Sequence, residues 1–230
     1  MKISGMTKLT VQDYPGEVAC IIFTQGCNFK CSFCHNSQLI PIKECDKSNL
    51  SEREIFDYLE TRKNILDGVV VSGGEPLIQP GIKDLIKKIK EMGFKVKLDT
   101  NGTNHNLLKE LIKDELIDYV AMDIKADLNI YAKITGHIMD YTPIKKSVEL
   151  ITKSNIDHEF RTTIIKEFHD LPCLENICNL IGSSAKYYLQ NFTLSDGVID
   201  KNLNGFSQDE LLNIEIKLKE KFPNVKVRDL

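Results

Sequence analysis

The chain has 230 residues, 42% of them hydrophobic, and is therefore long enough and apolar enough to bury a core. Its 30 Lys and Arg face 33 Asp and Glu, and the net charge of −3 argues against nucleic-acid binding, which needs a clustered basic surface. Residues 1–16 lack an apolar signal-peptide core, and no apolar run approaches the roughly 18 residues of a membrane span. We therefore expect a cytoplasmic protein with reduced cysteines that neither binds nucleic acid nor enters a membrane.

Buried-strand patterns alternate with helical patterns along the chain. A first strand is expected at residues 18–23, and a capping box at Ser51–Glu54 opens the first helix. Further strands are expected at residues 68–71, 94–98, 119–122, 158–165, 187–192 and 225–227. Further helices are expected at residues 82–92, 104–115, from 143 onward, 171–181 and, after a second capping box, 207–222.

This alternation predicts an α/β fold with a parallel sheet. About six strand–helix units fall short of the eight of a closed barrel, so we predict an open, partial (β/α)6 barrel. The alternative is a doubly wound flat sheet. We expect one domain over residues 1–230, with a core at about 17–193 and a helical C-terminal tail at about 205–230.

Three of the seven cysteines, Cys27, Cys31 and Cys34, follow the first strand at spacing C-x3-C-x2-C. A disulfide would leave one of them over, and thiolates this close repel one another unless a cation neutralises them. Structural zinc takes four ligands, but no second cysteine pair has zinc spacing, and His35 adjoins Cys34 too closely to reach the same ion easily. An iron–sulfur cluster with one open iron fits better. The remaining thiols carry no usable metal spacing: Cys20, Cys45, Cys173 and Cys178.

With Phe33 before the last cysteine, this loop resembles the signature of the radical S-adenosylmethionine (SAM) superfamily. In that family the three cysteines hold a [4Fe-4S] cluster, and the amino and carboxylate groups of SAM chelate the fourth iron. The resemblance therefore implies Cys27, Cys31 and Cys34 as metal ligands, and a [4Fe-4S] cluster and SAM as cofactors.

Glycines and charged residues collect at the ends of the predicted strands, where parallel α/β folds place their chemistry. Gly73, Gly74 and Glu75 end the second strand; a turn explains two glycines, but the glutamate is less readily explained that way. Asp123 and Lys125 flank one residue and so project to the same side of an extended strand, either toward a ligand or as an ion pair.

The resemblance implies a role for each of these residues. Gly73-Gly74-Glu75 resembles the motif that binds the methionyl amino group of SAM. Asp99, which ends the third strand, is implied as a contact of the ribose or the ammonium group, with an Asx turn as its alternative. The other implied cofactor contacts are Lys125 near the SAM carboxylate, Asp123 near the ribose, Phe33 beside the adenine, and Arg161 facing the mouth of the barrel or making a rim salt bridge.

Further segments resemble the activating proteins of anaerobic ribonucleoside-triphosphate reductases, a branch of the glycyl-radical-enzyme activators. They are Asp13–Gly16, Gln25–Cys27, His35–Asn36, Met122–Lys125, Phe160–Thr163 and Gln190–Phe192. Ser37 stands where many relatives have proline. The absence of a cysteine-rich insert between Cys34 and Gly73 disfavours activators with extra clusters.

This resemblance implies that a reduced cluster passes one electron to SAM, giving methionine and a 5′-deoxyadenosyl radical that takes hydrogen from a glycine of a partner enzyme. The implied partner is an anaerobic ribonucleotide reductase, with flavodoxin or ferredoxin as electron donor. Three alternatives stay open: an activator of another enzyme such as pyruvate formate-lyase, an enzyme similar to carboxydeazaguanine synthases that acts on a small molecule, and a zinc-stabilised binding module. His169, on a strand-exit loop, is left without a role.

Overall fold

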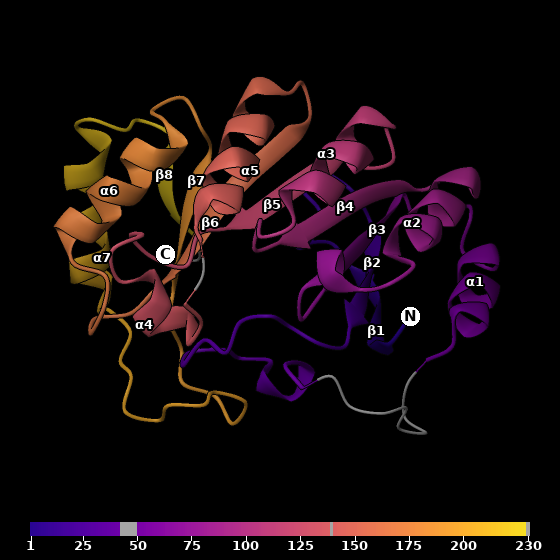
Figure 1. Ribbon diagram of the computed structural model, residues 1–230, viewed down its shortest axis with the longest axis horizontal. Helices are drawn as coiled ribbons and strands as arrows, with labels where there is room; N and C mark the ends of the chain where they lie inside the picture. Colours follow the sequence, from indigo (N-terminus) through magenta and orange to yellow (C-terminus); the bar gives the residue numbers. More distant parts are fainter. Residues whose placement is uncertain (42–49, 139, 229–230) are drawn as a thin grey trace.

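The computed structural model describes residues 1–41, 50–138 and 140–228. In these residues one eight-stranded sheet keeps its strands in chain order (Figure 1). The first pair is antiparallel, and every later pair is parallel. The strands are β1 (Ile3–Thr10), β2 (Ala19–Thr24), β3 (Gly68–Gly73), β4 (Lys95–Thr100), β5 (Tyr119–Asp123), β6 (Asp157–Ile164), β7 (Tyr187–Asn191) and β8 (Val225–Arg228).

Strand order decides between the two folds expected from the sequence. A doubly wound sheet reverses its strand order partway, whereas here each strand lies beside its predecessor throughout. Among the described strand pairings none joins β8 back to β1, so the curved sheet stays open. The prediction of an open, partial α/β barrel is therefore confirmed.

Helices cover the outer face of the curved sheet (Figure 1). They are α1 (Glu52–Glu60), α2 (Ile82–Glu91), α3 (His105–Lys113), α5 (Thr142–Lys153), α6 (Leu171–Ile181) and α7 (Gln208–Lys219), with short α4 (Tyr131–Thr135) and the 3-10 turns η1 (Ser37–Leu39) and η2 (Pro76–Ile78) in loops. Both predicted capping boxes are present, at the starts of α1 and α7. None of the described helices is long and apolar enough to span a bilayer.

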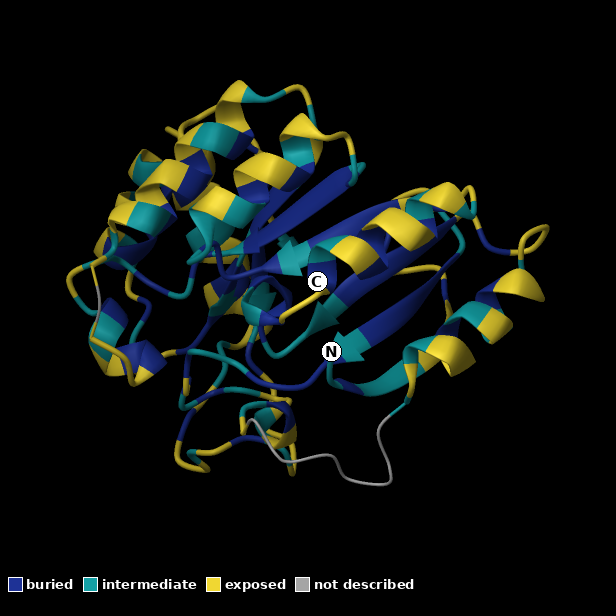
Figure 2. Ribbon diagram, turned by 45° about the vertical axis from the view of Figure 1, so that its right-hand side comes forward, coloured by how far each residue is buried: buried dark blue, intermediate teal, exposed yellow. Residues whose placement is uncertain are grey.

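The two faces of the sheet differ in chemistry because successive side chains of a strand point to opposite sides. On β4, Val96 and Leu98 belong to the main core beneath the helices, whose inward sides are buried (Figure 2). The residues between and after them, Lys97 and Asp99, lie on the concave face and pair with each other at 2.5 Å. The main hydrophobic core thus holds the sheet from outside, whereas the concave face carries a small apolar cluster that includes Ile21, Val70 and Tyr119 together with these polar groups.

The sequence pattern missed one strand, one α-helix and the two 3-10 turns, and it placed the other strands and helices. It did not indicate β1, which carries Gly5 and exposed residues, or α4, which is a single turn and a half long. The terminal strand is present as β8, so the segment expected to be a helical tail also adds a strand beside β7. Cys45 lies outside the described residues.

Candidate metal centre and cofactor site

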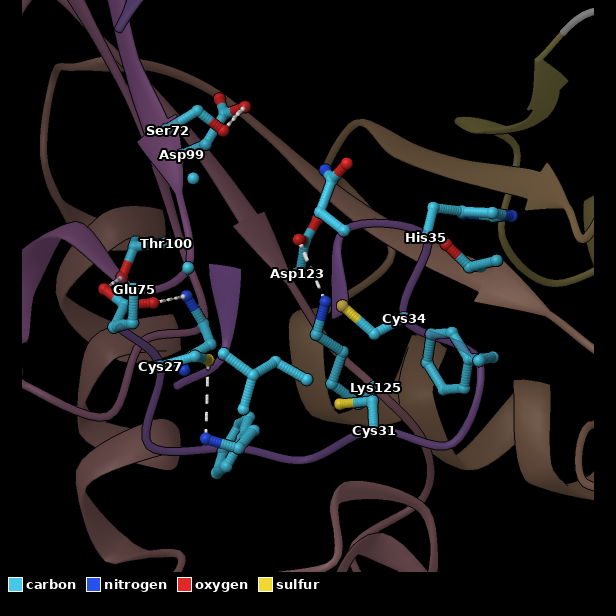
Figure 3. Close-up of a pocket in the computed structure, with 18 of the residues that line it drawn as sticks. Cys27, Cys31, Cys34, His35, Ser72, Glu75, Asp99, Thr100, Asp123 and Lys125 are labelled. Carbon is cyan, nitrogen blue, oxygen red and sulfur yellow. Dashed lines mark hydrogen bonds and ion pairs between the residues drawn. The ribbon is translucent and has the colours of Figure 1, made fainter. Parts of the chain in front are cut away.

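One cavity opens at the carboxyl ends of the parallel strands (Figure 3). Every site residue expected from the sequence lines it: Cys27, Cys31, Phe33, Cys34, Gly73, Gly74, Glu75, Asp99, Asp123, Lys125 and Arg161. These residues come from β6 and from the ends of, or the loops after, β2, β3, β4 and β5. The fold therefore gathers the whole predicted set in one place, while the cofactor contact assigned to each residue stays a prediction.

The cysteine loop after β2 has little regular structure, and other segments set its shape. The Cys27 N–H donates to Ile40 O at 3.1 Å. The Lys30 N–H donates to Thr135 O, at the end of α4, at 2.7 Å. In Figure 3 the three cysteine sulfurs lie at separate places around the cavity. The loop is thus held open from outside rather than closed around one point.

This donor set suits a cubane cluster. In the described part of the chain, no three His, Cys, Asp or Glu side chains gather closely enough for one metal ion. Ligands at three corners of a cubane lie farther apart than ligands of a single ion. Burial raises the pKa of Cys27 to about 12 and that of Cys31 to about 11, with Lys125 opposing the shift at both. Metal binding must therefore displace the thiol protons.

The two glycines at the end of β3, Gly73 and Gly74, are required by a close approach to the cysteine loop. A Cβ on Gly74 would lie 2.1 Å from the carbonyl oxygen of Gly26, the residue before Cys27. Gly73 has a φ of 122°, and a Cβ there would lie 2.3 Å from the Thr24 nitrogen. The turn and the cysteine loop can therefore share one wall of the cavity only if neither residue has a side chain.

Glu75 is buried beside this turn, with 1% of its surface exposed. Its Oε1 accepts from the Leu77 N–H at 3.0 Å and from the Thr100 hydroxyl at 2.7 Å. Its Oε2 accepts from the Asn101 N–H at 2.7 Å. Burial raises the pKa of Glu75 to about 7, against the pull of these three donors. Its carboxylate is thus fixed in orientation at the cavity wall (Figure 3).

The other charged residues form one ion-pair network across the ends of β4, β5 and β6. Arg161 Nε lies 2.8 Å from Asp123 Oδ1, and its Nη2 lies 3.4 Å from Asp99 Oδ2. Lys125 Nζ lies 3.0 Å from Asp123 Oδ2. Burial opposes the charge on Asp123, but Arg161 and Lys125 outweigh it and hold its pKa well below the ordinary value. These residues are therefore ion-paired and also face the cavity.

The network continues below the cavity through residues that the sequence did not single out. Glu159, 1% exposed, lies 3.9 Å from Arg161 and 2.9 Å from Arg228 of β8. Lys97, also 1% exposed, pairs with Asp99. The sequence did contain a signal for them, because Glu159 and Lys97 each stand two residues before a predicted site residue. Side chains two residues apart on a strand lie on the same face of the sheet.

Several residues to which the sequence gave no role at the site line the cavity, whereas three of the remaining cysteines do not. Thr163 and Gln190 line the cavity, and Gln190 belongs to a segment noted for its family resemblance. His35 also lines it and stacks on Phe192 at 5.5 Å between ring centroids. Three cysteines are buried free thiols that do not line it: Cys20, Cys173 and Cys178.

The fold and this cavity define a class: partial α/β barrel enzymes with a three-cysteine loop at the carboxyl edge of the sheet. Comparison with known proteins agrees. The profile described as "Radical SAM superfamily" matches residues 21–173. A Methanocaldococcus jannaschii protein assigned by its name to the glycyl-radical enzyme activating enzymes is 33% identical over 99% of this chain and 96% of its own.

Two further proteins extend the comparison. The pyruvate formate-lyase-activating enzyme of Clostridium pasteurianum is 30% identical over 95% of this chain and 90% of its own. A radical SAM methyltransferase from Sphaerobacter thermophilus shares the fold, with a TM-score of 0.74 and 16% identity over 96% of this chain and 68% of its own. The chain belongs to the radical SAM superfamily and, within it, to the glycyl-radical-enzyme activating enzymes. It is accordingly an enzyme whose cofactors are a [4Fe-4S] cluster and SAM.

Proposed function

We propose that this enzyme, working as a single domain, installs a glycyl radical on an anaerobic ribonucleoside-triphosphate reductase. The observation that carries the proposal is the shared cavity, in which three cysteines, a fixed glutamate and the Asp123–Lys125 pair face one another. Membership of the activating enzymes supports a glycyl radical enzyme as partner. The choice of the reductase rests on the segment resemblances noted in the sequence.

Each residue has a proposed task. Cys27, Cys31 and Cys34 would hold the cluster as thiolates. Glu75, fixed by its three donors, would accept hydrogen bonds from the amino group of SAM. Lys125 would face the SAM carboxylate. When bound, the cluster and SAM supply the one-electron cleavage chemistry of this superfamily.

The remaining residues would orient SAM and shield it. Asp99 and Asp123 would accept hydrogen bonds from the ribose hydroxyls, and Arg161 keeps both of them ionised and in place. Phe33, 4% exposed, would lie against the adenine and exclude water there. No side chain is required as an acid or base, so the protein contributes position, charge and a shielded site.

The test uses anaerobically purified protein loaded with iron and sulfide. With dithionite and SAM we expect methionine and 5′-deoxyadenosine, and with the reductase from the same genome we expect the doublet of a glycyl radical in electron paramagnetic resonance (EPR) spectra. Cys34→Ala should lose both, whereas Cys178→Ala, a buried cysteine that does not line the cavity, should keep both. No SAM cleavage by the loaded wild-type protein would refute the proposal.

A second partner has a specific observation in its favour. The Clostridium pasteurianum relative, similar over nearly the whole chain, is named for activating pyruvate formate-lyase. The same EPR experiment with purified pyruvate formate-lyase in place of the reductase separates the two. A doublet only with the lyase would transfer the proposal to that partner.

We also propose flavodoxin or ferredoxin as the physiological electron donor. Replacing dithionite by either reduced protein should sustain 5′-deoxyadenosine formation. If neither protein does so while dithionite does, this donor assignment is wrong and the proposed reaction is not affected.

A further inference from the structure

Three buried polar side chains converge on the backbone just after β5. The Thr162 hydroxyl donates to Ile124 O at 2.7 Å. The Lys125 N–H donates to the hydroxyl oxygen of Tyr131 at 3.2 Å, and a ring nitrogen of His169 lies 3.0 Å from Lys125 O. Tyr131 and His169 are completely buried. Both peptide groups of Lys125 are thus bonded by side chains from other segments rather than by the sheet.

The partners of His169 define its tautomer. Its Nδ1 accepts from the Ile165 N–H at 3.1 Å and must therefore carry the lone pair. Its Nε2 then carries the proton and donates to Lys125 O. Burial lowers the pKa of His169, in keeping with a neutral ring. The imidazole thereby links the loop after β6 to the carbonyl group of Lys125.

Tyr131 also contacts the cysteine loop. Its ring meets that of Phe29, which lies between Cys27 and Cys31, edge to face at 6.0 Å. At the other end of the same helix, Thr135 O accepts from Lys30 N at 2.7 Å. In Figure 1 this short helix, α4, lies directly above the indigo loop. One helix therefore touches both the cysteine loop and the backbone of Lys125.

We propose that Tyr131 and His169 are positioning residues that set Lys125 relative to the cysteine loop for SAM binding. This inference rests on the proposed contact between Lys125 and the SAM carboxylate. A lysine side chain is long and flexible, and Asp123 holds only its end, at 3.0 Å. Bonds to the N–H and C=O of Lys125 fix the other end of the side chain, so that less freedom is lost when SAM binds.

The test compares Tyr131→Phe, which removes only the hydroxyl, and His169→Phe, which removes both ring contacts. The measurements are the Kd of SAM for cluster-loaded protein, iron content, and exchange of the Lys125 amide hydrogen without SAM. We expect SAM to bind about tenfold more weakly in both variants, with iron content unchanged. The Lys125 amide should exchange faster in Tyr131→Phe. His169→Gln, which keeps a donor for Lys125 O, should recover most of the affinity.

Matched controls separate position from general damage. Tyr141→Phe makes the same change in a neighbouring ring, whose centroid lies 5.2 Å from that of Tyr131. His158→Phe makes the same change in a histidine at the amino end of β6, whose ring bonds Ile156 O. Affinities of Tyr131→Phe and His169→Phe within about twofold of these controls would overturn the inference. The inference would also be overturned if the variants lost iron but bound SAM with unchanged affinity per loaded cluster. The same holds if the Lys125 amide hydrogen exchanged at the wild-type rate in Tyr131→Phe. If wild type itself does not bind SAM, the proposed function fails first, and the amide exchange still tests the backbone contact.

Discussion

Asp123 is the residue on which the charges of the cavity converge. It accepts from Arg161 and from Lys125, and these two cations outweigh the cost of its burial. A carboxylate with a lowered pKa stabilises the fold above its ordinary pKa of 3.8, and this contribution is lost as the pH falls toward the folded-state value. Acid should therefore weaken the cavity wall at this point.

Asp123→Asn tests this link in the cluster-free protein. The variant should be less stable than wild type at neutral pH, because Arg161 and Lys125 lose a charged partner. The difference in unfolding free energy should narrow by on the order of 1 kcal/mol between about pH 6 and pH 3, since only wild type has this carboxylate to protonate. Urea unfolding at several pH values measures it. A difference that stays constant with pH would contradict the assignment.

Gly74 shows how one absent side chain can set a cavity wall. In Gly74→Ala the new Cβ would meet the backbone oxygen of Gly26, which cannot rotate away. We expect the unfolding free energy to fall by about 3 kcal/mol and the loaded iron to decrease. Gly5→Ala is the matched control, because no atom lies within 4 Å of a Cβ there. Equal effects of the two changes on iron loading would show that the close approach does not matter.

Among the elements, the segment after β7 is as important to the cysteine loop as α4. His35 contacts Thr193 O through its Nε2 at 2.7 Å, and Ser37 donates its hydroxyl proton to Gly197 O. The Asp200 N–H donates to Ser32 O at 2.9 Å. A segment without regular structure, which reaches the main core through Val198, therefore also holds the loop.

Gly197→Ala tests this support. The new Cβ would lie 2.0 Å from His35 O, so the segment must move away from the loop. We expect a chelator to remove iron about tenfold faster, because the loop opens more readily, with the main unfolding transition little changed. Iron release followed by absorbance measures the effect, again with Gly5→Ala as control. A large drop in global stability would instead place Gly197 in the main folding unit.

At the scale of the whole molecule, we expect the sheet to resist local opening better than the cluster loop does. The strands and outer helices share the main hydrophobic core, to which the cysteine loop contributes only Phe29, Cys31 and Phe33, while scattered backbone bonds hold the rest of the loop. Local opening follows such differences in contact density. The cavity therefore depends on the sheet more than the sheet depends on the cavity.

Removal of the cluster should accordingly act locally. Hydrogen exchange should speed up in residues 27–36 of the cluster-free protein, while amides of β3 to β6 stay protected. Exchange followed by mass spectrometry on both forms checks this expectation. Equal loss of protection in the strands would mean that cluster and sheet fold as one unit.

The sequence alone was enough to recognise the cysteine spacing, the strand–helix alternation and the residues at the strand ends. Cys27, Cys31 and Cys34 are neighbours in sequence, so their common loop follows from spacing. Parallel strands bring their carboxyl ends to one edge of the sheet, so the sequence alone predicts that Asp99 and Arg161 lie at one site. The sequence did not predict β1 because its hydrophobic pattern is weak, and it did not predict α4 because that helix has only 5 residues. Contacts with distant segments stabilise both elements.

The contacts that orient the site depend on the folded chain. His169 meets Lys125 O across 44 positions, and Arg228 meets Glu159 across 69. Local pattern reports periodicity and propensity, but it carries no record of which polar groups become neighbours once strands adjoin and water is excluded. Burial makes each such group need a partner, and only the packed arrangement of β5, β6, α4 and β8 selects that partner.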